Sequence, residues 1–205
     1  WGIETDYGKL TGGFKIIPAL ATLAYDGRRS GYFRNELFNA LAIIDQDHID
    51  PAQLSGSWAG AMGQTQFMPS SFLRYAVDYD GDGRRNIWTS KPDVFASAAN
   101  YLATNGWRDD INWGRQVRLP AGFRSDLAGL KVQKPPEEWR ALGVRRPDGG
   151  ELPSKAGLLG SIVLPAGDDG PAYLVYANYR AILTWNRSSF FAIAVGTLAD
   201  RIGDQ

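Results

Sequence analysis

Cysteine is absent from the 205-residue chain, so neither disulfide bonds nor thiol chemistry is available to it. Its single histidine, His48, lies among Asp45, Asp47 and Asp50, where we expect a solvated side chain rather than a catalytic one. The sequence also lacks a G-x-S-x-G nucleophile motif, and neither a dinucleotide fingerprint nor a phosphate loop follows a predicted strand. These absences favour acid–base chemistry by carboxylates.

An excess of charge and a long apolar run are also missing. Lys+Arg and Asp+Glu both number 22, so the formal net charge is zero, which argues against a nucleic-acid-binding protein. No apolar run approaches the roughly 20 residues that span a bilayer, and no signal peptide is visible. Because the chain opens abruptly at Trp1, we expect an N-terminal portion, with any targeting information, to precede it in the full protein.

Hydrophobic periodicity divides the chain into a helical first part, a β-rich middle and a helical end. Helices are expected at residues 16–25, 31–45, 93–105, 136–142 and 188–202. Short strands are expected at residues 116–119, 158–164, 172–176 and 181–185. The sequence therefore predicts an α+β protein, mainly α. The expected domains are a helical core at 1–107, a small β-rich domain at 108–183 and a C-terminal helix at 184–205 that returns to the core.

Local signals predict where several helices begin and end. Ser30 is expected to cap the helix at 31–45, and Asp50-Pro51 has the form of a further helix start. Residues 1–10 are expected to be the tail of a helix that Gly8 ends. In the last helix, four apolar residues share one face by their spacing: Phe191, Val195, Leu198 and Ile202.

Glu4 is the best candidate for a catalytic carboxylate because it lies between Ile3 and Tyr7 on a short apolar segment. Burial there would favour the protonated carboxyl group that a general acid needs. On a helix, Asp6 would point away from Glu4, because residues two positions apart lie on different faces. The alternative is an ordinary exposed glutamate on a helix.

Residues 57–71 read SWAGAMGQTQFMPSS and contain both methionines of the chain but neither Leu nor Ile. Small residues let a backbone approach a neighbour closely. Gln64 and Gln66 offer hydrogen bonds to a neutral polar ligand, and Phe67 and Met68 offer an adaptable apolar surface. Two interpretations follow: the wall of a cleft for an uncharged, hydroxyl-rich ligand, or a tight helix–helix contact with a polar exit loop.

Three alternating aspartates precede Gly83 in the order D-x-D-x-D-G, which is the opening of an EF-hand calcium loop. Position twelve of the loop is Thr89 rather than an acid, so Asp93, at position sixteen, is expected to close the site. Oxygen ligands alone disfavour zinc, and the alternative is an aspartate-rich turn that binds nothing. The predicted ligands of a structural calcium ion are Asp78, Asp80, Asp82, Arg84 through its carbonyl, and Asp93.

Five segments occur in the same order as in the membrane-bound lytic transglycosylase B family of peptidoglycan-cleaving enzymes, and the chain resembles that family over almost its whole length. The segments are residues 4–8, 57–71, 78–88, 99–107 and 185–188. The resemblance implies a lysozyme-like helical core, an EF-hand-like calcium loop and a small antiparallel β domain.

Glu4 matches the family's single catalytic acid/base. The positions that match residues of the substrate cleft, or stand in their place, are Ser57, Gln66, Phe67, Met68, Tyr101, Trp185, Asn186 and Phe191. Trp185 and Phe191 stand where a relative has tyrosine, and Phe191 cannot donate a hydroxyl hydrogen bond. In the metal loop Asp80 replaces a serine, and one extra residue precedes Asp93.

The resemblance implies cleavage between N-acetylmuramic acid and N-acetylglucosamine. Glu4 would protonate the glycosidic oxygen, the substrate's N-acetyl group would stabilise the anomeric centre, and Glu4 would then take the proton of the C6 hydroxyl. The product is a 1,6-anhydro end. A lysozyme-type hydrolase and a non-catalytic peptidoglycan-binding protein are the alternatives.

The implied partner is the glycan strand of peptidoglycan, bound by a monomer that does not bind nucleic acid. The implied location is the periplasm of a bacterial cell envelope. The sequence leaves open whether the full protein is an outer-membrane lipoprotein or secreted, and whether it contacts proteins of cell-wall synthesis or division.

Overall fold

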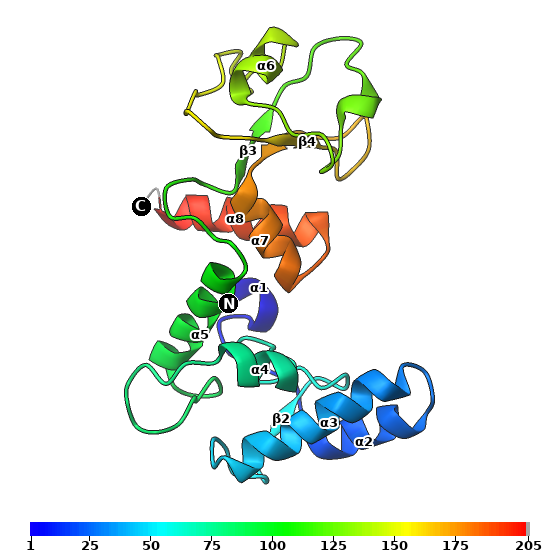
Figure 1. Cartoon of the computed structure of the whole chain (residues 1–205), viewed down its shortest axis with the longest axis vertical. Coiled ribbons are helices and arrows are strands. Elements are labelled where there is room, and N and C mark those ends of the chain that lie inside the picture. The colour runs from blue at the N-terminus through cyan, green and yellow to red at the C-terminus, as the bar shows by residue number, and fades with distance from the viewer. Residues whose placement is uncertain (204–205) are drawn as a thin grey trace. The chain divides into compact units, whose positions relative to one another are not determined.

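The computed structural model describes residues 1–203 and divides the chain into two compact units, Trp1–Tyr101 and Leu102–Gln205 (Figure 1). Helices dominate, and the two sheets are small and antiparallel, so the predicted α+β class is confirmed. The three predicted domains stay a prediction. Packing places residues 184–203 in the same unit as the β-rich segment.

The first unit consists of helices and one two-stranded antiparallel sheet. Its elements are α1 (Gly2–Thr5), β1 (Phe14–Lys15), α2 (Ile16–Tyr25), α3 (Ser30–Asp45), β2 (Ser55–Gly56), α4 (Pro69–Tyr75) and α5 (Lys91–Thr104), the last of which runs into the second unit. Ile16 and Leu20 lie one turn apart on α2 and are fully buried, as are Ala40 and Ile43 on α3. These apolar stripes account for the packing of α2 against α3 (Figure 1).

Two of the predicted helix starts are wrong. Arg29, in a left-handed conformation with φ 59°, precedes α3, and Ser30 is the first helical residue rather than its cap. Asp50 does not start a helix, because its carboxylate accepts the amide of Ala52 at 2.7 Å in an aspartate turn. The chain then continues to β2, which pairs with β1.

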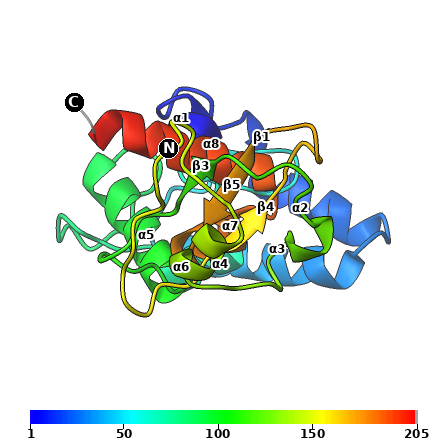
Figure 2. The same ribbon diagram turned by 90° about the horizontal axis from the view of Figure 1, so that it is seen from above.

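The second unit holds a three-stranded antiparallel sheet in the order β3-β5-β4 (Figure 2). Its elements are β3 (Gly114–Val117), a 3-10 turn (Ser125–Leu127), α6 (Pro136–Ala141), β4 (Ser161–Val163), β5 (Ala172–Val175), α7 (Ala177–Trp185) and α8 (Ser189–Gly203). The strand predicted at 181–185 is wrong, since these residues lie in α7. Tyr179 and Ile182 are buried three residues apart there, which is a helical spacing.

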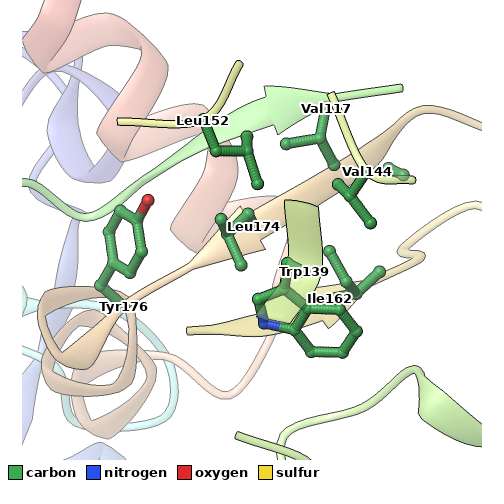
Figure 3. Close-up of a cluster of buried hydrophobic side chains, with 8 residues drawn as sticks. Val117, Trp139, Val144, Leu152, Ile162, Leu174 and Tyr176 are labelled. Atoms are coloured by element: carbon green, nitrogen blue, oxygen red, sulfur yellow. The ribbon is translucent and has the colours of Figure 1, made fainter. Parts of the chain in front are cut away.

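A hydrophobic cluster lies between this sheet and α6, and Figure 3 shows its side chains converging. Trp139 is fully buried, and its indole Nε1 donates to the Gly160 carbonyl at 3.0 Å. The helix predicted at 136–142 is confirmed as α6. Tryptophan anchors this short helix because it buries a large apolar surface while its one polar atom keeps a partner.

The buried face of α8 differs from the predicted one. Ala192, Ile193 and Gly196 are the buried residues of this helix. Gly196 lies against the Trp113 ring, so closely that a Cβ atom there would come within 2.3 Å of it. The Trp113 ring therefore packs against the face of α8 that carries Ala192 and Gly196, because larger side chains would not fit there. The Trp113 Nε1 donates to the Asp200 carboxylate at 2.9 Å.

Glu36 is buried in the middle of α3, with 3% of its surface exposed. Its carboxylate oxygens accept the Ser70 amide at 2.9 Å and the Ser70 hydroxyl at 2.6 Å. Ser70 lies in the first turn of α4, whose backbone amides have no partner within the helix. The carboxylate therefore caps α4 from another helix, and its charge lies at the positive end of the α4 dipole.

His48 is half-buried against the Phe72 ring, with 5.5 Å between ring centroids, so the expectation of a solvated side chain is wrong. The Arg85 Nε donates to its Nε2 at 3.1 Å. Burial first, and then the charge of Arg85, lower the pKa of His48 below its ordinary value. The imidazole therefore acts as a neutral acceptor.

Replacing Glu36 by glutamine should lower the free energy of unfolding by about 1–3 kcal/mol, because one of the two oxygens that accept from Ser70 would become an NH₂ group, which cannot accept a hydrogen bond. Urea denaturation measures the change. Glu138→Gln is the matched control: this side chain is 56% exposed and pairs with Lys134 on the surface, so a change within about 0.5 kcal/mol is expected. Equal effects of the two substitutions would contradict the capping role.

Stability should fall as the pH drops through the folded pKa of His48. The folded pKa lies below the ordinary 6.5, so the unfolded chain takes up this proton more readily, and the stabilisation is complete only above 6.5. Urea denaturation at several pH values between 7.5 and 5.5, about one unit either side of that value, measures the loss. His48→Gln should make this loss of stability at low pH smaller. An equal loss in the variant would refute the assignment of the pH dependence to His48.

Candidate active site and metal loop

Glu4 lies on α1, a single helical turn at the start of the first unit, and its side chain is half-buried. The helix ends at Asp6, which has a left-handed conformation with φ 46°, and not at Gly8 as the sequence predicts. Asp6 is exposed and pairs with Lys9 at 3.3 Å. The two neighbouring acids therefore have different surroundings, and the half-buried one is Glu4.

Gln64 fastens α1 to the 57–71 segment. Its carboxamide oxygen accepts the Trp1 indole at 2.8 Å, and its Nε2 donates to the Trp88 carbonyl at 2.8 Å. The Thr5 hydroxyl donates to the Gln64 backbone carbonyl at 3.1 Å. At Gly8, a Cβ atom would come within 2.3 Å of the same carboxamide, so only glycine allows this approach. Gln64 is thus a structural residue, a role that sequence reasoning missed.

Residues 57–68 form a chain of tight turns and not the helix–helix contact that was one of the two interpretations. Met62 and Phe67 exchange backbone hydrogen bonds at 2.8 and 3.1 Å, and the Ser57 amide donates to the Ala61 carbonyl at 2.8 Å. Gly60 has φ 96°, and a Cβ atom there would come within 2.5 Å of Leu20. The glycines are therefore required by the turns and by close packing, whatever the segment binds.

Six of the predicted catalytic and substrate residues lie in the first unit: Glu4, Ser57, Gln66, Phe67, Met68 and Tyr101. The Ser57 hydroxyl accepts the Ala61 amide at 3.0 Å, and Gln66 donates from its Nε2 to the Thr11 carbonyl at 3.1 Å. The rings of Phe67 and Tyr101 lie 5.7 Å apart. Met68 is half-buried and immediately precedes α4.

The other three predicted substrate residues, Trp185, Asn186 and Phe191, lie in the second unit where α7 is followed by α8. Asn186 ends α7, and its side-chain oxygen accepts the Ser188 amide at 3.0 Å. Phe191 is half-buried and packs against a cluster that includes Trp113. The phenyl ring therefore contributes to the core of this unit.

The metal loop brings three carboxylates together. One oxygen each of Asp78, Asp80 and Asp93 lie within 4.8 Å of one another. Asp93 is fully buried and accepts the amides of Tyr79 at 2.8 Å and Asn86 at 2.7 Å, so it joins the two ends of the loop. A carboxylate has about four lone pairs, so these bonds still allow it to bind a cation.

The remaining predicted ligands are placed differently. Asp82 is exposed and is not one of the three converging carboxylates; its oxygen accepts the Arg84 amide at 2.8 Å. The Arg84 guanidinium pairs with Asp47 at 3.1 Å. Thr89 accepts a hydrogen bond from Asn86 at 2.7 Å. Ligation by Asp82 and by the Arg84 carbonyl stays a prediction.

The family model for the transglycosylase SLT domain matches residues 1–200. The membrane-bound lytic murein transglycosylase B of Escherichia coli K12 is 36% identical over 214 residues, which cover 98% of this chain and 54% of that protein. The chain thus spans about half the length of this curated relative.

Solved structures have the same fold. SltB3 from Pseudomonas aeruginosa, in complex with NAG-anhNAM-pentapeptide, superposes with a TM-score of 0.95 at 51% identity, covering 98% of this chain and 54% of that one. The Escherichia coli lytic transglycosylase SLT35, in complex with calcium, superposes with a TM-score of 0.82 at 33% identity, covering 98% and 63%. The chain therefore belongs to the transglycosylase SLT domain family.

Proposed function

We propose that this chain is a lytic transglycosylase that cleaves the glycan strand of peptidoglycan, with Glu4 as its acid and base. The observation that carries the proposal is the attachment of the Glu4 helix to the 57–71 segment through Gln64, in a chain matched to the family over residues 1–200. The relative SltB3 was solved with NAG-NAM-pentapeptide and with NAG-anhNAM-pentapeptide, which are a muropeptide and its anhydro form.

The proposed reaction needs one carboxyl group that changes its protonation state between two steps. Glu4, protonated, gives its proton to the glycosidic oxygen between N-acetylmuramic acid and N-acetylglucosamine, and the bond to the anomeric carbon breaks. The substrate's N-acetyl group shields the positive anomeric carbon. Glu4, now a carboxylate, takes the proton of the muramic C6 hydroxyl as that oxygen bonds to C1. The proton balance closes, and no water is consumed.

The other buried or half-buried acids of the first unit accept hydrogen bonds from backbone amides. Glu36 accepts the Ser70 amide, Asp78 accepts the amides of Gly81 and Gly83, and Asp93 accepts two amides of the metal loop. Each of these three carboxylates therefore has a structural task. A hydrolase with a second catalytic carboxylate needs another acid near the reacting bond, so the proposed mechanism rests on Glu4 alone.

The substrate-binding roles of the remaining residues are part of the same proposal. Phe67 is buried, with 3% of its surface exposed, and its ring lies beside that of the half-buried Tyr101. In this proposal Phe67 supports Tyr101, whose aromatic face suits the apolar face of a sugar. The other proposed substrate residues are Ser57, Gln66, Met68, Trp185, Asn186 and Phe191. The substrate would carry peptide stems on its muramic acid units, like the fragments bound to SltB3.

We further propose that the metal loop binds calcium as a structural ion through Asp78, Asp80 and Asp93. Three converging carboxylates repel one another without a cation, and calcium prefers oxygen ligands. The relative SLT35 was crystallised with calcium. The ion would hold the loop that contains Trp88, whose carbonyl accepts the Gln64 side chain, so loop order and α1 attachment would be linked.

The proposed location is the periplasmic side of a bacterial cell envelope, where peptidoglycan lies. The Escherichia coli relative is described as membrane-bound. Within the described part of this chain, no helix is both long and apolar enough to cross a bilayer.

Glu4→Gln should reduce cleavage of purified sacculi by at least about a thousandfold, because general acid–base catalysis contributes roughly 10²–10⁴-fold and this residue serves both steps. Release of muropeptides, followed by chromatography, measures the loss. Asp6→Asn is the matched control: it lies two residues away, its left-handed conformation suits asparagine, and full activity is expected. Substantial activity in Glu4→Gln would remove the assignment.

Mass spectrometry of the products separates the proposed reaction from hydrolysis. A 1,6-anhydro end is lighter by one water than a hydrolysed end. Hydrolysed ends would identify a lysozyme-type enzyme, and binding without any released muropeptide would identify a non-catalytic protein.

Calcium should raise the melting temperature of the purified chain, and a chelator should reverse the rise. A ligand that binds only the folded state at a hundred times its dissociation constant stabilises it by about 2.7 kcal/mol. Asp80→Asn should abolish the response, whereas Asp169→Asn, an exposed acid of the second unit, should keep it. A response that survives Asp80→Asn would place the ion elsewhere.

A further inference from the structure

A groove of about 470 Å³ lies along helix α2 in the first unit. Two separate parts of the chain line it: residues 14–23, in β1 and α2, and the turn that contains Trp58. None of these residues takes part in the proposed bond cleavage. The apolar residues that line the groove are Phe14, Pro18, Ala19, Leu23 and Trp58.

Two aromatic side chains of this groove are exposed. Trp58 has 63% of its surface exposed, and Phe14 has 57%. Single exposed apolar side chains are common on proteins, but large ones that line the same concave surface mark a binding site. The groove therefore offers two aromatic rings to a ligand.

Backbone hydrogen bonds hold both aromatic residues in place. Phe14 lies on β1 and pairs with Gly56 of β2. Trp58 comes two residues after Gly56, in a turn where the Gly60 amide donates to the Ser57 carbonyl at 3.1 Å. A ligand would meet rings whose backbone is already ordered, which lowers the entropic cost of binding.

The lining of the groove is nearly uncharged. It includes no acid, and its one cation, Lys15, donates to the Ala52 carbonyl. The Thr22 hydroxyl donates to the Pro18 carbonyl at 2.8 Å, so its oxygen can still accept a hydrogen bond from a ligand. The groove thus combines aromatic surface with a neutral acceptor.

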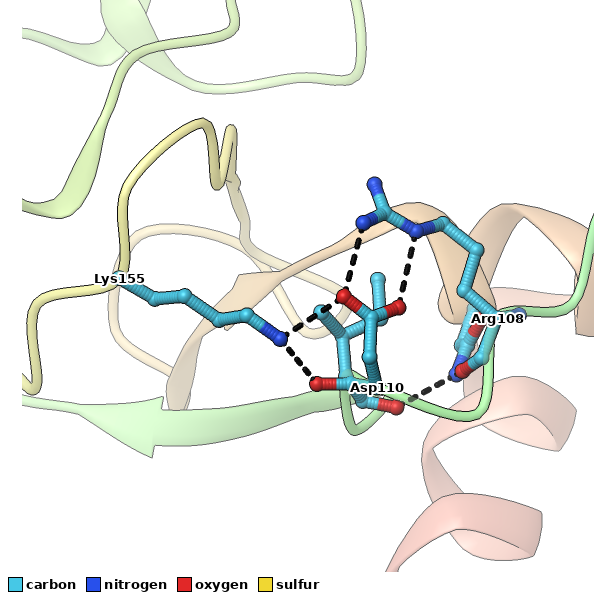
Figure 4. A network of polar contacts seen from close by, with 5 residues as sticks. Arg108, Asp110 and Lys155 are labelled. Carbon is cyan, nitrogen blue, oxygen red and sulfur yellow. Dashed lines mark hydrogen bonds and ion pairs between the residues drawn. The ribbon is translucent and has the colours of Figure 1, made fainter.

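A cavity of the second unit has the opposite character, because ion pairs surround it. This cavity, beside β3, includes Asp110 and Lys155 in its lining. Figure 4 shows the Asp110 carboxylate between Lys155 and Arg108, at 2.8 and 2.9 Å. Its charged groups already have partners within the protein, whereas the rings of Phe14 and Trp58 are open to a ligand.

The groove adjoins two of the proposed substrate residues. Trp58 directly follows Ser57, and both lie in the same turn. A Cβ atom at Gly60 of this turn would come within 3.3 Å of the Met68 side chain. Ser57 and Met68 are proposed to contact the glycan strand, so a strand held by them would pass close to Trp58.

Exposed aromatic rings in a nearly uncharged groove suit a neutral ligand with one apolar face and several hydroxyl groups. A pyranose ring has this character, because its C–H bonds form an apolar face and its hydroxyl groups surround it. Resting on the proposed function, we propose that this groove binds an N-acetylglucosamine residue of the glycan strand, away from the bond that is cleaved. A muramic acid unit fits less well, since its peptide stem carries charge.

The test is a titration of the whole ¹⁵N-labelled chain with chitotetraose, a tetramer of N-acetylglucosamine, and separately with N-acetyl-leucinamide, a small apolar probe. The indole N–H signal of Trp58 reports binding in NMR spectra. Chitotetraose should shift this signal saturably, and the amide should not. No shift with chitotetraose, or equal shifts with both probes, would overturn the proposal.

Two variants separate the groove from the rest of the surface. Trp58→Ala should weaken chitotetraose binding about tenfold, and Trp58→Phe should weaken it less because an aromatic face remains. Tyr25→Ala is the matched control, since Tyr25 ends the same helix, is 94% exposed and does not line the groove. Its affinity should equal that of the natural chain. Equal affinities of Trp58→Ala and the control would refute the site.

Kinetics on soluble glycan strands test whether the groove acts away from the reacting bond. Trp58→Ala should raise KM and leave kcat unchanged, because it removes binding that is equal in the ground state and the transition state. A lower kcat at an unchanged KM would place Trp58 at the reacting bond and overturn the proposal. The melting temperature should stay the same, since Trp58 is exposed.

The failure of this site and the failure of the proposed activity have different signatures. Glu4→Gln should bind chitotetraose as the natural chain does, because Glu4 does not line the groove. Chitotetraose binding at Trp58 without cleavage of sacculi would refute the proposed activity but keep this site. Cleavage without binding at Trp58 would refute this site but keep the activity.

Discussion

The side chain of Gln64 is the contact on which the candidate active site depends. Its oxygen accepts the Trp1 indole, its nitrogen donates to the Trp88 carbonyl, and its backbone carbonyl accepts the Thr5 hydroxyl. These bonds hold α1 against the 57–71 segment. One carboxamide therefore connects the Glu4 helix, the 57–71 segment and the metal loop.

Buried carboxylates in the first unit accept hydrogen bonds from backbone amides that have no partner in a helix or a sheet. Glu36 satisfies the start of α4, and Asp93 satisfies two amides of an irregular loop. Backbone amides that are buried without a partner are costly, and an ionised acceptor gives them strong bonds. The proposed calcium ion would add to this arrangement, because it would neutralise the charge that Asp93 shares with Asp78 and Asp80.

The sequence predicted the elements that follow from local periodicity. Residues 16–25 and 136–141 are helical as expected, and the α+β class holds. The sequence-based prediction failed where contacts between residues far apart in the chain determine the local structure. The strand expected at 181–185 is helical because Tyr179 and Ile182 bury one face together, and the buried face of α8 is set by the Trp113 ring at Gly196. Neither contact is visible as a short-range pattern.

By itself, the sequence determined the class of fold, the family resemblance and the acidic loop, since these depend on residue types and short spacings. Glu4 as the catalytic residue is a prediction that rests on the resemblance. Only the tertiary structure decided that Gln64 serves the fold, that Asp82 lies outside the converging carboxylates, and that Phe14 and Trp58 line one groove. The physical reason is that hydrogen-bond partners and burial depend on residues far apart in the chain. A sequence shows which atoms can form hydrogen bonds, but which atoms become partners depends on the tertiary structure.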